Sequence, residues 1–374
     1  MPNDQAHDPQ VPTAGERVAQ PVALSVAPVS SGGSASGSGI SVSYTGTGIG
    51  ETVTISTSTL NFTTKSNAAP LWYVDPGAEG TIDASPLSRT ALSLAGRPFG
   101  NLDTAIKYGP NGAAKAEQVG SAPGYRTNSD TLGPSQGVLK TDVDGAGDHI
   151  RIMSRWRRNF DGLDAYAKQV EFGGTAWNIK GWRWWASVAG TKNNMVFSYG
   201  QSNTEDGGPR VTPENSASGT AYPQGTDKAL WGLKKDAWVS EVIDIKQSSA
   251  PDVADGLVRM ICDGQEFAYE NVITQDSSVG GRYVDLVMEQ WQFVYTDTPF
   301  IKWHDFIYVD DTPHALVITD KPSWGTEGAI IDPLIPIAWG SAEITAKTRC
   351  NISGKYLYLI DGNGDLLNTN GVAL

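Results

Sequence analysis

Hydrophobic and polar residues alternate along the chain with a period of two, most clearly between residues 148 and 318. This alternation predicts β-strands with one apolar and one polar face, because successive side chains of a strand point to opposite faces. Turn-forming residues separate the runs, and no segment repeats its apolar residues with the period of a helix. The strongest runs are HIRIMSRWRRNF, NNMVFSYG, WVSEVIDIK, LVRMICDGQEF, RYVDLVMEQWQFVY, FIKWHDFIYVDD and HALVITD. The pattern predicts an all-β fold, a large antiparallel β-sandwich of the jelly-roll type.

The two ends of the chain differ from this central part. The N-terminal segment is rich in Pro, Ala, Ser and Gly and poor in aromatic residues, which predicts an extended arm without a core of its own. The segment that follows predicts two strands around the turn GTGIGE, and the C-terminal segment predicts three short strands. Because each end has few apolar residues, we expect them to complete one small sandwich together. The predicted parts are the arm (1–38), the first part of the small sandwich (39–70), the jelly roll (71–320) and the C-terminal part of the small sandwich (321–374).

Composition narrows the classes of function. The chain has 374 residues and a net charge of −13. Such an acidic chain is not expected to bind nucleic acid, which needs basic surface that displaces phosphate counterions. No run of about 18 apolar residues predicts a membrane span, and the first ten residues lack the basic and apolar regions of a secretory signal. Cys262 and Cys350 show no metal-ligand spacing, and two free thiols are favoured over a disulfide.

Motifs near residue 260 resemble a known superfamily. Trp238, then alternating apolar positions, then ADGLVRMICDGQEF, are similar to the concanavalin A-like lectin and glucanase jelly roll, in which a strand opened by Trp precedes a D-G-x-V-x-x-x-x-D-G strand and turn. The flanking runs GETVTIS, NAAPLWYVD and AWGSAEITAKT resemble Ig-like domains of the IPT/TIG type. The resemblance implies a fold and leaves function open, because lectins, hydrolases, lyases and virion proteins all use such sandwiches. The matching positions are Trp238, Asp255, Gly256, Val258, Asp263 and Gly264.

Two acidic residues of WVSEVIDIK are the candidates for glycoside hydrolysis. Retaining glucanases on this fold use two carboxylates on one face of a strand. Glu241 and Asp244 are three residues apart, so without a bulge they fall on opposite faces of the strand. The spacing therefore does not favour a hydrolase.

A polysaccharide lyase needs a His or Tyr for proton transfer and Arg, Gln or Asn to neutralise a uronate carboxylate. His304 and Tyr308 fall on one face of KWHDFIY by simple alternation, and Gln290 and Gln292 fall on one face of MEQWQFVY. The lyase motif Q-x-H on a strand is absent. Glu241, His304 and Tyr308 are therefore catalytic candidates of an alternative hypothesis only.

Tryptophans are the candidate contacts with glycans or other subunits. Trp182 and Trp184 fall on one face of WNIKGWRWWA and Trp185 on the other, while Trp291 and Trp303 belong to other predicted strands. Exposed rings of this kind stack on sugars or on a partner subunit, whereas buried rings belong to the core.

No cofactor and no metal site is expected. DGNGDLLN places Asp361, Asn363 and Asp365 at offsets like those of a calcium loop, but Leu366 replaces the required Gly and the final Glu is absent. We interpret the run as a hairpin turn. A structural Ca²⁺ is the alternative there, and also at DVDGAGD.

These observations favour a non-enzymatic structural protein of a bacterial virus, either a capsid decoration or a fibre protein on the virion surface. The arm would dock on other virion proteins, the chain would form a homo-oligomer, and the jelly roll would contact surface glycans. Neither nucleic acid nor a membrane is an expected partner. The alternative is a polysaccharide lyase or glycan-binding protein of a bacterium, outside the cell or on its surface.

Overall fold

The computed structural model describes residues 33–37, 39–57, 62, 65, 67–75, 83–84, 106–107, 116–121, 137–141, 148–158, 178–186, 194–201, 210–214, 237–275, 277, 282–292 and 300–374. These residues form strands β1 to β23, and no helix in these ranges has the length and hydropathy of a membrane span. All strand pairs are antiparallel, so the predicted all-β fold with a jelly-roll type of sandwich is confirmed.

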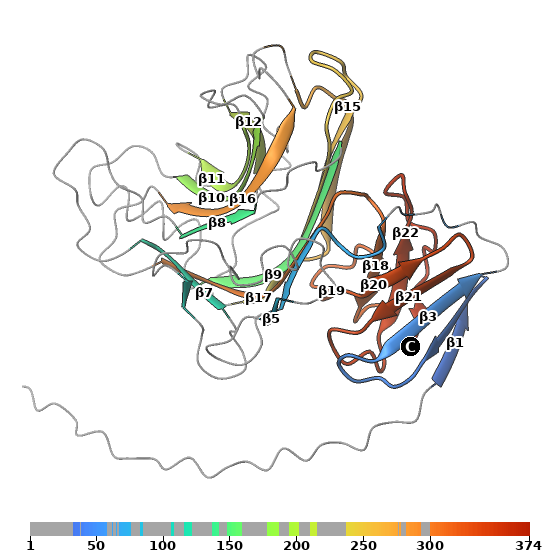
Figure 1. Ribbon diagram of the computed structural model, residues 1–374. Coiled ribbons are helices and arrows are strands. Elements are labelled where there is room, and N and C mark those ends of the chain that lie inside the picture. The colour runs from blue at the N-terminus through green and yellow to red at the C-terminus, as the bar shows by residue number, and fades with distance from the viewer. Residues whose placement is uncertain are drawn as a thin grey trace, which may run out of the picture.

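Two sheets build the large sandwich, and the larger sheet curves around the smaller one (Figure 1). The smaller sheet has the order β12 (Arg210–Glu214), β11 (Asn194–Gln201), β10 (Asn178–Ala186), β16 (Tyr283–Gln292) and β8 (Gly137–Thr141). The nine-stranded sheet has the order β15 (Gln265–Val272), β14 (Gly256–Cys262), β13 (Val239–Lys246), β9 (His149–Arg158), β17 (Phe300–Asp310), β4 (Trp72–Asp75) and β5 (Asp83–Ala84), with β7 (Ala116–Ser121) on β17 and β6 (Ile106–Lys107) on β7.

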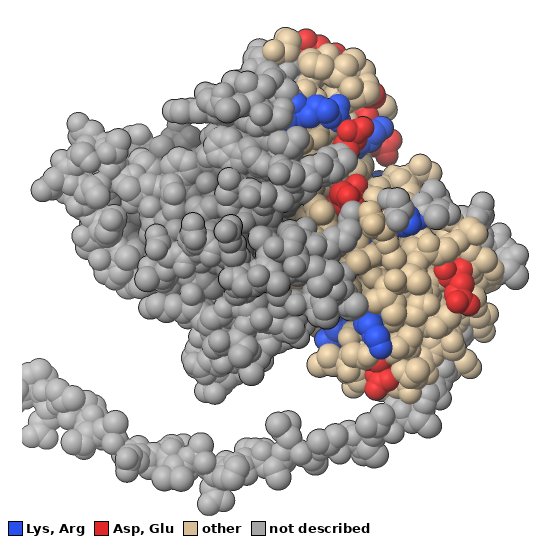
Figure 2. Space-filling view, in the orientation of Figure 1, with Lys and Arg blue, Asp and Glu red and all other residues tan. Residues whose placement is uncertain are grey.

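The small sandwich also has two sheets, and one of them joins both ends of the chain. That sheet has the order β1 (Gly33–Gly37), β2 (Ile40–Tyr44), β3 (Thr52–Thr57), β21 (Glu343–Lys347) and β20 (Ile335–Trp339). The other has the order β19 (Ile331–Pro333), β18 (Ala315–Thr319), β22 (Tyr356–Ile360) and β23 (Val372–Ala373). Few charged side chains lie on the small sandwich in the face seen in Figure 2.

Two strands of the small sandwich, β1 and β18, lie in segments that the sequence analysis assigned to other parts of the chain. Strand β1 falls within the expected arm, where backbone pairing with β2 orders residues that have no large apolar side chain. Strand β18 falls within the segment assigned to the jelly roll, yet it pairs with β19 and β22. The predicted domain limits and the Ig-like resemblance otherwise remain predictions.

Strand β18 is apolar from Ala315 to Ile318 because it is buried on both faces. Leu316 and Ile318 belong to the core of the small sandwich. Ala315 and Val317 belong to a second core that packs against the nine-stranded sheet. A strand covered on both sides has a continuous apolar run in place of alternation. The sheet of β18 is therefore the middle layer between the rest of the small sandwich and the large one.

The two faces of the nine-stranded sheet pack against different parts of the protein. Its outer face packs on the small sandwich through Tyr73, Met153, Val242, Ile261, Phe306 and Tyr308. Its inner face is formed by the alternate positions of the same strands. It faces the smaller sheet of the large sandwich, which contains β8, β10, β11, β12 and β16 (Figure 1). Described residues of the inner face are Ile150, Ile152, Ser154, Trp156, Glu241, Ile243, Ile245, Val258, Met260, Ile307 and Val309, all buried.

Candidate functional site

A β-bulge interrupts strand β17 at Asp305. His304 lies opposite Trp156 of β9, whereas Phe306 lies opposite Arg155, the adjacent residue of β9. Asp305 is thus one extra residue, and the strand changes face after it. His304 and Tyr308 consequently fall on opposite faces of the sheet. The prediction that they share a face is wrong, because counting along the sequence does not detect an inserted residue.

Backbone register places His304 and three other polar residues at neighbouring positions of the inner face. His304 lies opposite Trp156, and two residues earlier Lys302 lies between Gln118 of β7 and Arg158 of β9. Positions two apart in a strand share a face, so Lys302 and its neighbours Gln118 and Arg158 lie on the same face as His304 and Trp156. The backbone register therefore groups one His, two cations and one amide across three strands.

Glu241 lies on the same inner face, one strand further along the sheet. Its Oε2 accepts hydrogen bonds from Nε1 of Trp156 and Oγ of Ser154, both at 3.2 Å. The carboxylate is buried, and these two donors offset part of its desolvation. Glu241 thereby orients the ring of Trp156, the cross-strand neighbour of His304. Asp244 lies on the other face of the strand, as its spacing from Glu241 predicts.

Tyr308 lies on the outer face, in a buried polar cluster at the junction of the two sandwiches. Its hydroxyl donates a 2.9 Å hydrogen bond to Oδ2 of Asp310, the oxygen that also pairs with Nζ of Lys65. Burial raises the pKa of Asp310, and the opposing charge of Lys65 does not reverse this. Tyr308 is therefore held within the junction, and the structure does not bring it together with the other two catalytic candidates.

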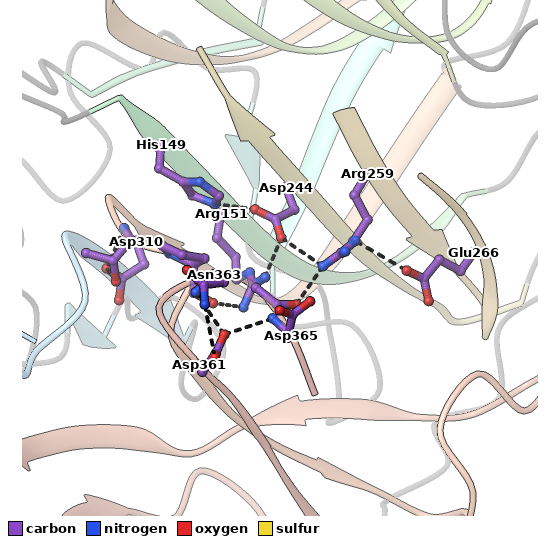
Figure 3. A network of polar contacts seen from close by, with 12 residues as sticks. His149, Arg151, Asp244, Arg259, Glu266, Asp310, Asp361, Asn363 and Asp365 are labelled. Atoms are coloured by element: carbon purple, nitrogen blue, oxygen red, sulfur yellow. Dashed lines mark hydrogen bonds and ion pairs between the residues drawn. The ribbon is translucent and has the colours of Figure 1, made fainter. Parts of the chain in front are cut away.

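A second buried network joins the two sandwiches beside this cluster (Figure 3). Asp244 pairs with His149 and Arg151 of β9 and, at 3.8 Å, with Arg259 of β14. Burial alone would raise the pKa of Asp244, but the charges and hydrogen bonds of Arg151 and His149 lower it. The carbonyl oxygen of Gly364 in the small sandwich accepts a 2.6 Å hydrogen bond from Nη1 of Arg259. This network binds the two sandwiches to each other.

The acidic turn after β22 satisfies its own backbone. Oδ1 of Asp361 accepts hydrogen bonds from the backbone N–H of Asn363 at 2.8 Å and of Asp365 at 3.0 Å. Asp361 is thus occupied by the hairpin turn itself. No group of three or more His, Cys, Asp or Glu side chains in the described ranges could hold a metal ion. Cys262 and Cys350 form no disulfide, and Sγ of Cys350 accepts a 3.2 Å hydrogen bond from Nζ of Lys355.

The candidate tryptophans fall into two groups. Trp182 and Trp184 are completely buried, with the ring centroid of Trp184 5.6 Å from that of Tyr283. Neither ring lies on the surface, where a glycan or another subunit would contact it. Trp291 and Trp303 are placed by backbone register alone, on β16 and β17.

Sequence reasoning did not single out Gln118, Arg158, Lys302 or the bulge that separates His304 from the outer-face positions after it. A signal was present: His304 and Asp305 are adjacent polar residues within the strand run FIKWHDFIYVDD. Two polar neighbours in a half-buried strand are a sign of an inserted residue, since strict alternation would bury one of them.

No protein-family model matches the chain, and no curated protein sequence matches it. Several solved structures are similar. The PL-14 alginate lyase from Aplysia kurodai matches 65% of this chain and 99% of that chain, with 10% identity and a TM-score of 0.43. The alginate lyase Aly36B matches 65% and 98%, with 11% identity and a TM-score of 0.41. The alginate lyase vAL-1 from Chlorella virus matches 55% and 88%, with 10% identity and a TM-score of 0.35.

These similar structures contradict the prediction of a non-enzymatic virion protein. The three are enzymes that act on a polysaccharide, and the one of viral origin is itself an alginate lyase. The prediction that the chain is not an enzyme is wrong by the same finding, and the alternative hypothesis agrees with it better. At these identities and TM-scores the likeness assigns no role to any residue. The predicted partners and localisation remain predictions.

Proposed function

We propose that the chain is a polysaccharide lyase that cleaves an acidic polysaccharide by β-elimination, with His304 as the proton-transfer group. The observation that carries the proposal is the bulge at Asp305. Before the bulge, His304 and Lys302 occupy positions of the inner face, and Lys302 pairs there with Gln118 and Arg158; after the bulge, Phe306 and Tyr308 occupy the outer face. Bulges commonly lie next to active sites, where they redirect a side chain.

The residue types in this row match the chemistry of β-elimination. A base removes the proton beside the carboxylate of a uronate, the bond to the neighbouring sugar breaks, and an acid protonates the departing oxygen. The proton is acidic enough only when the carboxylate charge is neutralised, which cationic and amide donors accomplish. Lys302, Arg158 and Gln118 would bind the carboxylate. His304 would exchange the proton, since histidine changes charge near neutral pH.

The charge of the whole chain strengthens this assignment. A net charge of −13 repels a polyanion, so an acidic substrate needs a local group of cations. Strand β9 ends in Arg157 and Arg158, and Lys302 lies across from the latter. The row is thus one place where an otherwise acidic protein has cations next to a histidine.

Glu241 has a supporting role in this proposal. Its carboxylate is used by Trp156 and Ser154, so it holds the ring beside His304 and does not itself transfer a proton. The buried acid would keep that ring in one orientation during turnover, because an indole N–H that loses its acceptor in the interior is costly.

The test is an assay of the full chain on a panel of polysaccharides. Alginate, the substrate named for the similar structures, pectate and hyaluronan are incubated with the protein, and a neutral glucan serves as the control. Ultraviolet absorption of the new carbon–carbon double bond measures elimination. We expect activity on at least one uronate polymer, reduced about a hundredfold or more in His304→Gln. Absence of unsaturated product from every uronate polymer, or full activity of His304→Gln, would overturn the proposal; binding without cleavage would indicate a glycan-binding protein.

A further inference from the structure

The bulge in β17 needs support from outside its own sheet. An extra residue disrupts the hydrogen-bond ladder at that point, so the local geometry depends on side-chain contacts. The edge of β17 also changes partner here: β7 pairs with residues 300–304, and β4 pairs with residues 307–309. The backbone at His304 is therefore held by its pairing with β7 and β9 and by the contacts of the next two residues, Asp305 and Phe306.

Arg349 of the small sandwich holds both residues. Its Nη2 lies 3.2 Å from Oδ2 of Asp305, and its guanidinium lies 4.2 Å from the centre of the Phe306 ring. Arg155 of β9 adds a longer ion pair to Asp305, at 3.6 Å. A planar guanidinium can pair with a carboxylate through one edge and stack on an aromatic ring through its face, which a lysine cannot do.

Arg349 is itself fixed within the small sandwich. Its side chain is only 4% exposed, and Nη1 pairs with Oδ1 of Asp332 on β19. The other oxygen of Asp332 accepts a 2.9 Å hydrogen bond from Nζ of Lys355. Burial would raise the pKa of Asp332, but the charges of Arg349 and Lys355 lower it, so the carboxylate is ionised and keeps Arg349 in place. The guanidinium is thus a rigid link from the small sandwich to the bulge.

We infer that Arg349 is a positioning residue for His304, acting through the Asp305–Phe306 bulge, so that the small sandwich supports the catalytic geometry of the large one. This inference rests on the proposed function. It gives the docked small sandwich a role beyond stability, because a displacement of about 1 Å in a reacting group can lower turnover by about a hundredfold.

The test compares Arg349→Gln and Arg349→Lys with Arg259→Gln as the matched control. Arg259 is also a largely buried arginine at the same junction, but its partners are Asp244, Glu266 and Gly364, away from the bulge. The first measurement is the imidazole NMR signal of each histidine, with that of His304 assigned from His304→Gln. The second is kcat, KM and the pH profile of kcat on the best substrate.

We expect both Arg349 variants to move the His304 signal, to lower kcat by about tenfold to a hundredfold with little change in KM, and to shift the pH profile. Arg259→Gln should move the signal of His149, which shares Asp244 with Arg259, and leave that of His304 and kcat unchanged. An unmoved His304 signal in Arg349→Gln, or equal losses of kcat in Arg259→Gln, would overturn the inference. The NMR comparison needs no substrate, so failure of the lyase proposal and failure of this inference are separate results.

Discussion

Nη1 of Arg259, on the large sandwich, donates a 2.6 Å hydrogen bond to the carbonyl oxygen of Gly364, on the small one. Gly364 has a φ of 86°, and a Cβ there would lie 3.1 Å from the same Nη1. A residue without a side chain therefore lets the turn approach the buried ion network closely. Together with the contacts of Arg349, this hydrogen bond adds polar contacts to the apolar core that joins the two sandwiches.

A second glycine at the junction tests how closely the large sandwich packs against the small one. Gly264 has a φ of 83°, and a Cβ there would lie 1.9 Å from the carbonyl oxygen of Thr326. We expect Gly264→Ala to lower the free energy of unfolding by about 3 kcal/mol or more, from the strained φ plus the overlap. Urea denaturation measures the loss.

Gly354→Ala is the matched control for that variant. Gly354 has a φ of 72° but nothing within 4 Å of its added Cβ. It should therefore lose only the conformational term, about 1–2 kcal/mol. Equal losses in the two alanine variants would contradict the close approach of Gly264 to the segment that contains Thr326.

Replacement of Asp244 by Asn should remove a pH-dependent part of the stability. Because the pKa of Asp244 is lowered in the folded protein, the unfolded chain binds the proton first as pH falls. Its contribution is thus complete above the ordinary aspartate pKa of about 3.9 and is lost progressively below it. We expect Asp244→Asn to lower the free energy of unfolding near neutral pH by about 3–5 kcal/mol, since Arg151 and His149 lose their buried anion.

The variant should also show a flatter dependence of stability on pH in the acid range than the parent chain. Asp148→Asn is the comparison, because Asp148 pairs with Arg282 at 2.6 Å on the surface, with its side chain 69% exposed. Such exposed pairs contribute at most about 1 kcal/mol. A loss in Asp244→Asn as small as that of Asp148→Asn would count against the buried network.

Lys65 and Asp310 should behave as a coupled pair. Both side chains are completely buried, so Lys65→Met or Asp310→Asn alone leaves an uncompensated charge or donor and should cost about 3–5 kcal/mol. The double variant removes both and should lose much less than the sum of the single losses. A double-mutant cycle in urea measures the coupling, and additive losses within about 0.5 kcal/mol would refute the pairing.

Tyr308→Phe tests whether the outer face of the sheet takes part in turnover. The variant loses the hydrogen bond to Asp310, so we expect about 1 kcal/mol less stability. Because Tyr308 lies on the outer face, lyase turnover should not change. A large fall in kcat without loss of fold would place Tyr308 at the reacting atoms and contradict the assignment to His304.

Period-two alternation was sufficient to predict strands β13, β14 and β17 and to place Glu241 and Asp244 on opposite faces. The reason is local: side-chain direction alternates along any strand, whatever surrounds it. The same counting failed for His304 and Tyr308, because one inserted residue reverses the alternation and is visible only in the pairing of β17 with β9.

The local sequence pattern likewise did not predict that the tryptophans are buried or that the acidic residues form buried ion pairs. A Trp on a strand has the same sequence signature whether it lies in a core or on a surface, and Trp182 and Trp184 proved to be core residues. The paired charges Lys65–Asp310 and Arg349–Asp332 come from segments far apart in the chain or from separate strands and turns. No window of sequence contains both partners together with the packing that buries them.

The amino-acid sequence was thus enough to establish an all-β chain of antiparallel strands, since alternation and turn residues act over a few positions. The face on which His304 lies, its register with Lys302, Gln118 and Arg158, and the contacts of Arg349 with Asp305 and Phe306 follow from the folded chain. They depend on strand register, and register is set by packing between residues up to hundreds of positions apart.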